Sequence, residues 1–573
     1  QAPPVVDFTQ SFPDDSMSGT PGDADSDADG YRVMTGTNSF IPILFDTPLI
    51  AAGAENLTIR VSEFMHLTGS FFFEQGPTIN PTLAPGLLSD PTEIASAIGV
   101  DIDAGFLGTG MKSIRTLTVG ATDVHAFIGI DGPYWVDSSD GSALDNGIID
   151  RNSDGSIVAS EINEDAVGLV VDDLDFGFLL GTPTDPTDPI RYAALNASAE
   201  TARVVGLEDE GVVATADDIL IQLNMSSPAL GGLPVLPVIN FKSLDPINGF
   251  GVKTGAKNPD GTDVTVNLLM DEVLVAAEVG FLQMELFGGA FLSGSFAFEL
   301  GPTEDVTLTD GNTKRVSTMT LGAANVTGFI GAGGPYWTDD DGNQEVSPGE
   351  LSDDSVGFAM TDLDVGIMLM AAVDPNDPGV YLAAKLNVYA FEMVGIDGLT
   401  ADGTFDVEFN VGFGLNGIDP NINPVNFGTT FSEVPALYTM LDSITVDGII
   451  DLDEQNAAFE SGYIGSDITT VSELVAVLNA PGAPPAGEEP TEPDEFLNID
   501  EVLDKLLDSF ETTNQPAIDA LDADDNGRLN TGYEVNTGNS DAPVTLDFDK
   551  FLINIPVSYT HLRAHETTAS ISY

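Results

Sequence analysis

Two short acidic segments have the residue types and the spacing of calcium-binding loops. Calcium takes about six to eight oxygen ligands on a short flexible loop, and the pattern D-x-[DN]-x-[DN]-G-x5-E supplies them. The first segment, 150–161, has the required residue type at each defining position, including the turn glycine Gly155. The ligands that it predicts are Asp150, Asn152, Asp154, Ser156 and Glu161.

The second segment, 339–350, follows the first at an offset of 189 residues (339 − 150). It has Gln344 in place of the turn glycine, and Gly342 is expected to relieve the turn. Its predicted ligands are Asp339, Asp341, Asn343, Glu345 and Glu350. Because no helix pattern flanks either segment, we expect isolated calcium loops that stiffen a connection between strands and cancel charge.

A third segment, 522–534, matches the first part of the pattern, but its closing glutamate comes one residue late. Its predicted ligands are Asp522, Asp524, Asn526, Arg528 and Glu534. Each segment also fits an acidic, solvated turn that binds nothing. The shared offset of the first two favours calcium, because unrelated acidic sequence would not keep it.

Charge and composition exclude several classes of protein. The 573 residues include 92 Asp and Glu against 17 Lys and Arg, which gives a formal net charge of −75. This charge argues against binding to nucleic acid or to anionic lipid. The chain has no cysteine, so disulfides, thiolate zinc sites and cysteine nucleophiles are excluded. No apolar run approaches the ~18 residues of a membrane helix, which predicts no membrane insertion in this segment.

A polyanion of this kind needs screening by salt or by bound cations in order to stay compact. We therefore expect an extracellular or cell-surface location in saline or calcium-rich surroundings. The partners that this predicts are surface glycans or other copies of the chain.

The sequence repeats itself. Residues 69–78 recur at 294–303, an offset of 225 (294 − 69), and Gly-Pro-Tyr-Trp at 132–135 recurs at 334–337, an offset of 202 (334 − 132). With the later offset of 189, this indicates two insertions in copy one, of 23 (225 − 202) and 13 (202 − 189) residues. Such self-similarity indicates tandem copies. The predicted organisation is an acidic segment 1–37, copy one 38–245, a linker 246–262, copy two 263–428, a connector 429–543 with a Pro-rich linker, a truncated third copy 544–556 and a tail 557–573 that resembles translated sequencing-adapter sequence.

Apolar residues alternate with polar ones through both copies, as at 57–61 and 117–128, and this period of two predicts strands. The expected fold class is all-β. Short similar units in series favour stacked β-solenoid-like rungs, and tandem β-sandwiches are the alternative. A few short helices are expected in the connectors, at 90–98, 470–478 and 500–507.

Enzymatic function is not expected. Asp173 and Asp175 recur as Asp362 and Asp364, which favours corners or cation ligands over the two acids of a glycosidase. The scarcity of Lys and Arg argues against a polysaccharide lyase. The Gly-Pro-Tyr-Trp motif fits either a sugar-binding aromatic platform or, as we favour, a turn whose rings pack on the scaffold.

Tandem copies, Gly-Pro-Tyr-Trp followed by a calcium loop, and extreme acidity together resemble the long repetitive surface proteins of aquatic bacteria, some of which carry a LEPR-XLL leader. The resemblance covers 38–428 and the start of the third copy. It implies a calcium-stabilised repeat segment of a large adhesin or matrix protein. A carbohydrate-active solenoid, either a lyase or a hydrolase, and a surface-layer or filament subunit are the alternatives.

Overall fold

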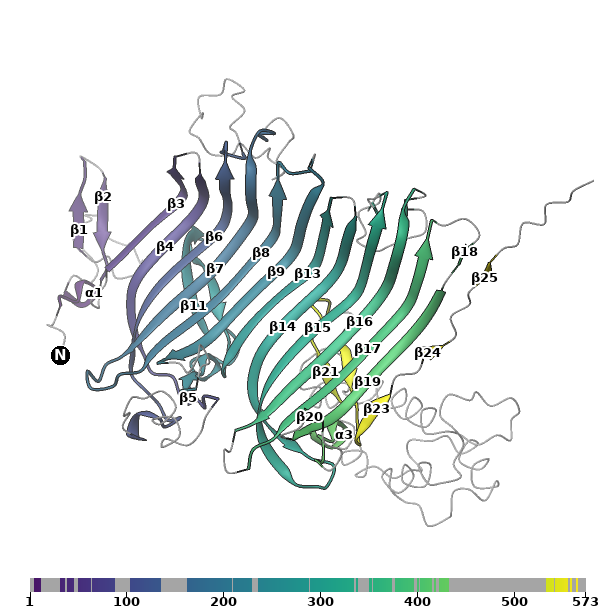
Figure 1. Ribbon diagram of the computed structural model, residues 1–573. Coiled ribbons are helices and arrows are strands. Elements are labelled where there is room, and N and C mark those ends of the chain that lie inside the picture. The colour runs from purple at the N-terminus through teal and green to yellow at the C-terminus, as the bar shows by residue number, and fades with distance from the viewer. Residues whose placement is uncertain are drawn as a thin grey trace, which may run out of the picture.

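The described part of the chain consists almost entirely of strands (Figure 1). The computed structural model describes, with short interruptions, residues 5–11, 31–36, 39–45, 50–87, 104–135, 162–228, 235–333, 336–338, 350–431, 532–558 and 563–564. The predicted helices at 90–98, 470–478 and 500–507 lie outside these residues. The described helical segments are short: α1 (Phe8–Ser11), η2 (Ala104–Phe106), η4 (Phe241–Ser243) and α3 (Phe427–Thr430).

One sheet of 15 strands dominates the fold, and its strands lie side by side in chain order (Figure 1). A first strand set consists of β3 (Ile50–Val61), β4 (Met65–Ile79), β6 (Ile114–Ile130), β7 (Val167–Pro183), β8 (Arg191–Val205) and β9 (Val212–Ser227). A second strand set consists of β13 (Leu274–Leu286), β14 (Ala290–Thr307), β15 (Thr313–Ala332), β16 (Val356–Ala372), β17 (Val380–Val394) and β19 (Asp402–Gly414). The short strands β20 (Gly417–Ile418), β23 (Leu552–Asn554) and β24 (Val557–Ser558) pair with β19.

The all-β prediction is confirmed, but the favoured arrangement of its strands is wrong. β6 pairs with β7, and β7 with β8, in antiparallel fashion, whereas solenoid rungs would stack in parallel. The two strand sets are not separate sandwiches either, because β13 pairs with β9 and joins them into one sheet. Alternation of apolar residues is the same in parallel and antiparallel strands, so the pattern could not decide between them.

The register of the two sets agrees in detail. Against β4, the register of β3 shifts between Ala54 and Leu57. Against β14, the register of β13 shifts between Val279 and Leu282, at an offset of 225 (279 − 54). A β-bulge therefore occupies the same place in both sets.

Two small hairpins cover one face of the sheet. The first consists of β11 (Phe250–Lys257) and β12 (Asp263–Leu268), and the second of β21 (Tyr533–Val535) and β22 (Val544–Leu546). They approach the sheet closely at glycines: a Cβ on Gly120 would collide with the carbonyl of Lys253, and one on Gly322 with the carbonyl of Asn536. β11 lies within 246–262, which the sequence had assigned to a linker.

Each hairpin closes a hydrophobic core against its strand set. Leu179, Val252 and Leu268 are buried together in the first core, and Met368, Val535 and Leu546 in the second. The remaining strands are β1 (Tyr31–Met34), β2 (Phe40–Ile43), β5 (Leu83–Ala84), β10 (Val238–Ile239), β18 (Leu399–Thr400) and β25 (Arg563–Ala564).

Candidate functional site

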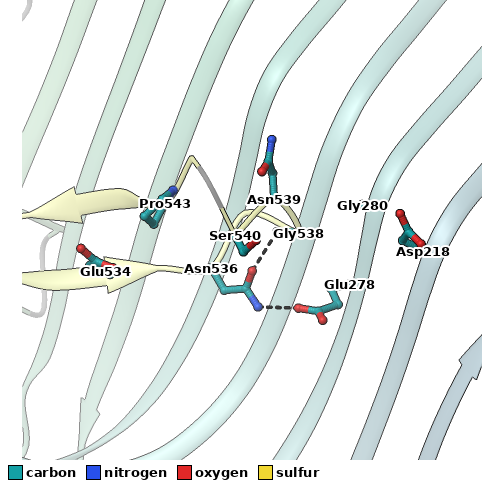
Figure 2. Close-up of a pocket in the computed structure, with 9 residues that line it drawn as sticks. All are labelled: Asp218, Glu278, Gly280, Glu534, Asn536, Gly538, Asn539, Ser540 and Pro543. Atoms are coloured by element: carbon teal, nitrogen blue, oxygen red, sulfur yellow. Dashed lines mark hydrogen bonds between the residues drawn. The ribbon is translucent and has the colours of Figure 1, made fainter. Parts of the chain in front are cut away.

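A cavity of about 770 Å³ lies where the turn of the β21–β22 hairpin passes over β9 and β13 (Figure 2). The Asn536 side chain connects its two walls. Its Nδ2 donates to Oε2 of Glu278 on β13 at 2.5 Å, and its Oδ1 accepts from the backbone N–H of Gly538 at 2.8 Å. Asp218 from β9 and Glu534 from β21 also line the cavity.

An adjoining cavity of about 350 Å³ shares Glu278 and Asn536 with the first, and the two together form an acidic trough. Burial and then the charges of Asp271, Glu304 and Glu299 raise the pKa of Glu272 to about 7. Burial and the charge of Glu278 raise the pKa of Glu299.

The trough suits a cationic group better than an anion or an apolar molecule. Lys242 lies 3.4 Å from Asp271 at its border and offsets part of the charge. Within the described ranges, however, no group of three or more His, Asp or Glu side chains is arranged to hold a metal ion. The trough is therefore a surface feature with a strong field and no assigned ligand.

Most of the predicted calcium ligands fall outside the described residues, so these predictions stay untested. This applies to Asp150, Asn152, Asp154, Ser156, Glu161, Asp339, Asp341, Asn343, Glu345, Asp522, Asp524, Asn526 and Arg528. Glu534 is described and lies on β21 at the trough. Glu350 is described and accepts a hydrogen bond from Nε1 of Trp337 at 3.1 Å.

The tryptophans of the Gly-Pro-Tyr-Trp motifs each pair with the residue that follows one of the first two predicted loops. Trp135 forms a β-bridge with Ile162, and Trp337 forms one with Leu351. Each bridge partner directly follows the predicted closing glutamate, Glu161 or Glu350. The rings of both tryptophans are buried in aromatic clusters, which supports the packing interpretation of the motif over a sugar platform.

The recurring Asp pairs stabilise bends inside strands. Asp173 and Asp362 adopt positive φ angles of 50° and 54° in β7 and β16. Oδ1 of Asp175 accepts from the backbone N–H of Asp123 at 2.8 Å, and Oδ1 of Asp364 accepts from that of Asn325 at 3.0 Å. These carboxylates are engaged by neighbouring strands, which agrees with a structural role.

The sheet face opposite the hairpins carries a row of apolar side chains that crosses both strand sets. Alternate residues of a strand point to opposite faces, so the neighbours of the hairpin-facing Gly120 and Gly177 belong to this row. None of its members is buried, and no described element covers them. The row consists of Val119, Phe178, Leu195, Leu223, Val275, Leu300, Met319, Leu369 and Leu382. Met319 is 38% exposed and the other members are half-buried. A contiguous apolar surface that stays partly exposed is typical of an interaction site.

One signal was missed in the sequence. The pattern G-[YF]-x-V-x-T-G occurs at 30–36, 249–255 and 532–538, and the last two instances form the first strands of the covering hairpins. The pattern would have identified the hairpins, but its strands are short and their alternation is weak.

No described helix has both the length and the apolar character needed to cross a membrane. The chain matches no protein-family model, no curated protein and no solved structure.

Proposed function

We propose that this chain is a structural and binding segment of a large extracellular bacterial protein, built from copies of one unit joined edge to edge. The observation that carries the proposal is the junction between β9 and β13. These strands pair over 12 register positions, from Leu274 opposite Asn224 to Leu286 opposite Val212, which makes the junction as extensive as the pairings within a set. A junction of this kind extends a sheet without a flexible linker.

The C-terminal part of the described chain supports a continuing array. β23 pairs with β19 so that Leu552 lies opposite Asn410, just as Leu274 of β13 lies opposite Asn224 of β9. The Asn224 amide donates to the carbonyls of Ile239 and Glu272, and the Asn410 amide donates to those of Val425 and Lys550. Residues 552–554 thus lie on β19 as residues 274–276 lie on β9, which supports a further copy after the second.

Calcium is part of the proposal. Trp337, two residues before the predicted loop 339–350, forms a bridge with Leu351 directly after it, and its hydrogen bond orients Glu350, the residue expected to close that loop. With 92 acidic residues against 17 basic ones, bound divalent ions would also reduce the repulsion that opposes folding. The open apolar face gives the array a surface for partners. The antiparallel sheet removes the fold argument for a carbohydrate-active solenoid.

Differential scanning calorimetry of the full chain tests the proposal. With saturating calcium we expect one cooperative transition for both strand sets, because they share a sheet, and a lower melting temperature after chelation with EGTA. Two independent transitions would show that the sets are separate domains. A melting curve that chelation leaves unchanged would remove calcium from the proposal.

A further inference from the structure

The first described residues have the same local structure as the two elements that cover the sheet. In the β1–β2 hairpin, Tyr31 lies opposite Ile43 and Val33 opposite Ile41. The matching pairs are Phe250 with Leu268 and Val252 with Val266 in β11–β12, and Tyr533 with Leu546 and Val535 with Val544 in β21–β22. All three hairpins begin with the pattern G-[YF]-x-V-x-T-G.

A short helical segment accompanies each hairpin. The Asp7, Asn240 and Asn426 side chains each accept a backbone N–H three residues on, at 2.8, 2.9 and 3.0 Å. The next residue is phenylalanine in each case, and the N–H groups of Phe8, Phe241 and Phe427 donate to the carbonyls of Phe45, Met270 and Phe548. We call each combination of helical segment and hairpin a cap module.

The three cap modules differ in what they cover. In the second and third modules, Val252 and Leu268 are 1% and 0% exposed, and Val535 and Leu546 are both 0% exposed, because they pack on the preceding strand set. In the first module, Val33, the counterpart of Val252 and Val535, is 39% exposed. Ile41 is 60% exposed where its counterpart Val544 is 6% exposed, and Ile43, the counterpart of Leu268 and Leu546, is half-buried. In Figure 1, β1 and β2 are drawn outside the outline of the sheet, on the side where β3 ends it.

The sheet edge next to this module is open as well. β13 pairs with β14 on one side and with β9 on the other, whereas β3, its counterpart at the offset of 225, pairs with β4 alone among the described strands. An unpaired edge strand readily accepts a further strand. The second cap module and β13 both contact the strand set that precedes them, whereas the first cap module and β3 have no such strand set among the described residues.

We propose that the first cap module and the outer edge of β3 form one interaction surface, and that its partner is a further six-stranded unit of the kind seen in the two strand sets. The last strand of the partner pairs with β3, as β9 pairs with β13. Two facing glycines of the partner, in the places of Gly120 and Gly177, receive the β1–β2 hairpin. This inference rests on the proposed repeat array.

The partner is a further unit because both strand sets of this chain already hold a hairpin at those glycines. A Cβ on Gly177 would meet Val252 and Val266, and one on Gly366 would meet Val535 and Val544. The partner should also carry an asparagine on its last strand, in the place of Asn224 and Asn410. Its amide would donate to the carbonyl of Val6, the counterpart of Ile239 and Val425.

An extended chain tests this directly. Residues 50–237, which contain the first strand set, are fused ahead of Val5 of the full chain, in the order in which β9 precedes the second cap module. We expect hydrogen exchange of the Tyr31–Ile43 amides to slow by about 100-fold or more relative to the parent chain. The double variant Val33→Asp, Ile41→Asp should abolish this protection in the extended chain and change nothing in the parent. Unchanged exchange in an extended chain whose added strands are protected would overturn the proposal.

A graft keeps the proposal testable if the added unit does not fold. In the full chain, residues 239–271 are replaced with 6–46, and in a control with a Gly-Ser linker of equal length. A graft that melts within a few degrees of the parent, and well above the linker control, supports the proposal. A graft that melts with the control overturns it. Neither the hydrogen-exchange result nor the graft result depends on whether the two strand sets melt in one transition. A failure of the proposed function in the calorimetric test would therefore be recognised separately.

Discussion

Asn224 and Asn410 allow a quantitative test of the equivalence between the two strand sets. Each side chain is buried, at 1% and 0% exposure, on the last long strand of its set. The Asn224 Nδ2 donates to the carbonyls of Ile239 at 2.8 Å and Glu272 at 2.7 Å, and the Asn410 Nδ2 donates to those of Val425 at 2.8 Å and Lys550 at 3.0 Å. Each amide thus ties the end of a set to the chain that continues the sheet.

Substitution by alanine removes one buried hydrogen bond, to Ile239 or Val425, and one partly buried hydrogen bond, to Glu272 or Lys550. A buried group left unsatisfied costs about 1–3 kcal/mol and a partly buried one less, so Asn224→Ala and Asn410→Ala should each lower the free energy of unfolding by roughly 1–4 kcal/mol. The assay is urea denaturation followed by circular dichroism in saturating calcium. Gln222→Ala is the matched control, because Gln222 lies on the same strand and makes only a 3.5 Å hydrogen bond to Asn196. We expect it to change stability by less than about 0.5 kcal/mol.

The comparison of the two variants decides the reasoning. Similar losses at both positions would support a common role at the end of each set. If Asn224→Ala destabilised the protein and Asn410→Ala did not, the segment 550–554 would not be held as β13 is. The equivalence behind the continuing array would then be refuted.

Three further predictions follow from other contacts. Gly322→Ala should displace the β21–β22 hairpin, because the new Cβ would meet the Asn536 carbonyl. Increased binding of the dye ANS would report the exposed core. Gly328→Ala is the control, because its Cβ would make only ordinary contacts. Trp337→Phe keeps a buried ring but removes the hydrogen-bond donor to Glu350. Calcium affinity measured by titration calorimetry should therefore fall about 10-fold or more. An unchanged affinity would exclude the loop 339–350 as a calcium site. The pKa of Glu272 is raised to about 7, so the folded chain binds a proton there more tightly than the unfolded chain. The stability that this proton contributes is lost as the pH rises from about 4.5 to 7. Glu272→Gln should therefore make the melting temperature of the calcium-free protein less dependent on pH over this range, and an unaltered pH profile would contradict the shift.

The sequence predicted the strands well because apolar residues alternate with others along them, as Leu117 and Val119 do in β6. It did not predict which face is buried, because Thr116 and Thr118 are buried while Leu117 and Val119 are half-buried. It did not reveal how the strands pair. The strands are long: β15 alone has 20 residues, far more than a short solenoid rung needs. Strands of this length favour antiparallel hairpins. Attention to strand length would have favoured the antiparallel sheet.

The candidate site was predicted less completely. The Trp motif and the offset of 189 indicated the two loops, and the structure describes how Trp337 and Glu350 meet at the end of one of them. The acidic trough could not be foreseen, because Glu278 and Asn536 are 258 residues apart and meet only when the hairpin folds back onto the sheet. Contacts of such sequence separation leave no local pattern.

The agreement between strand order and chain order has a mechanical consequence. Each long strand is hydrogen-bonded mainly to the strands before and after it, so a pull on the two ends of the chain loads the outermost strands first. Strands would detach singly from the edges while the interior stayed intact. A 15-residue strand such as β8 would release about 50 Å of slack as it is drawn out. A tether made of such units would lengthen in steps under flow and shorten again when the drag ceased.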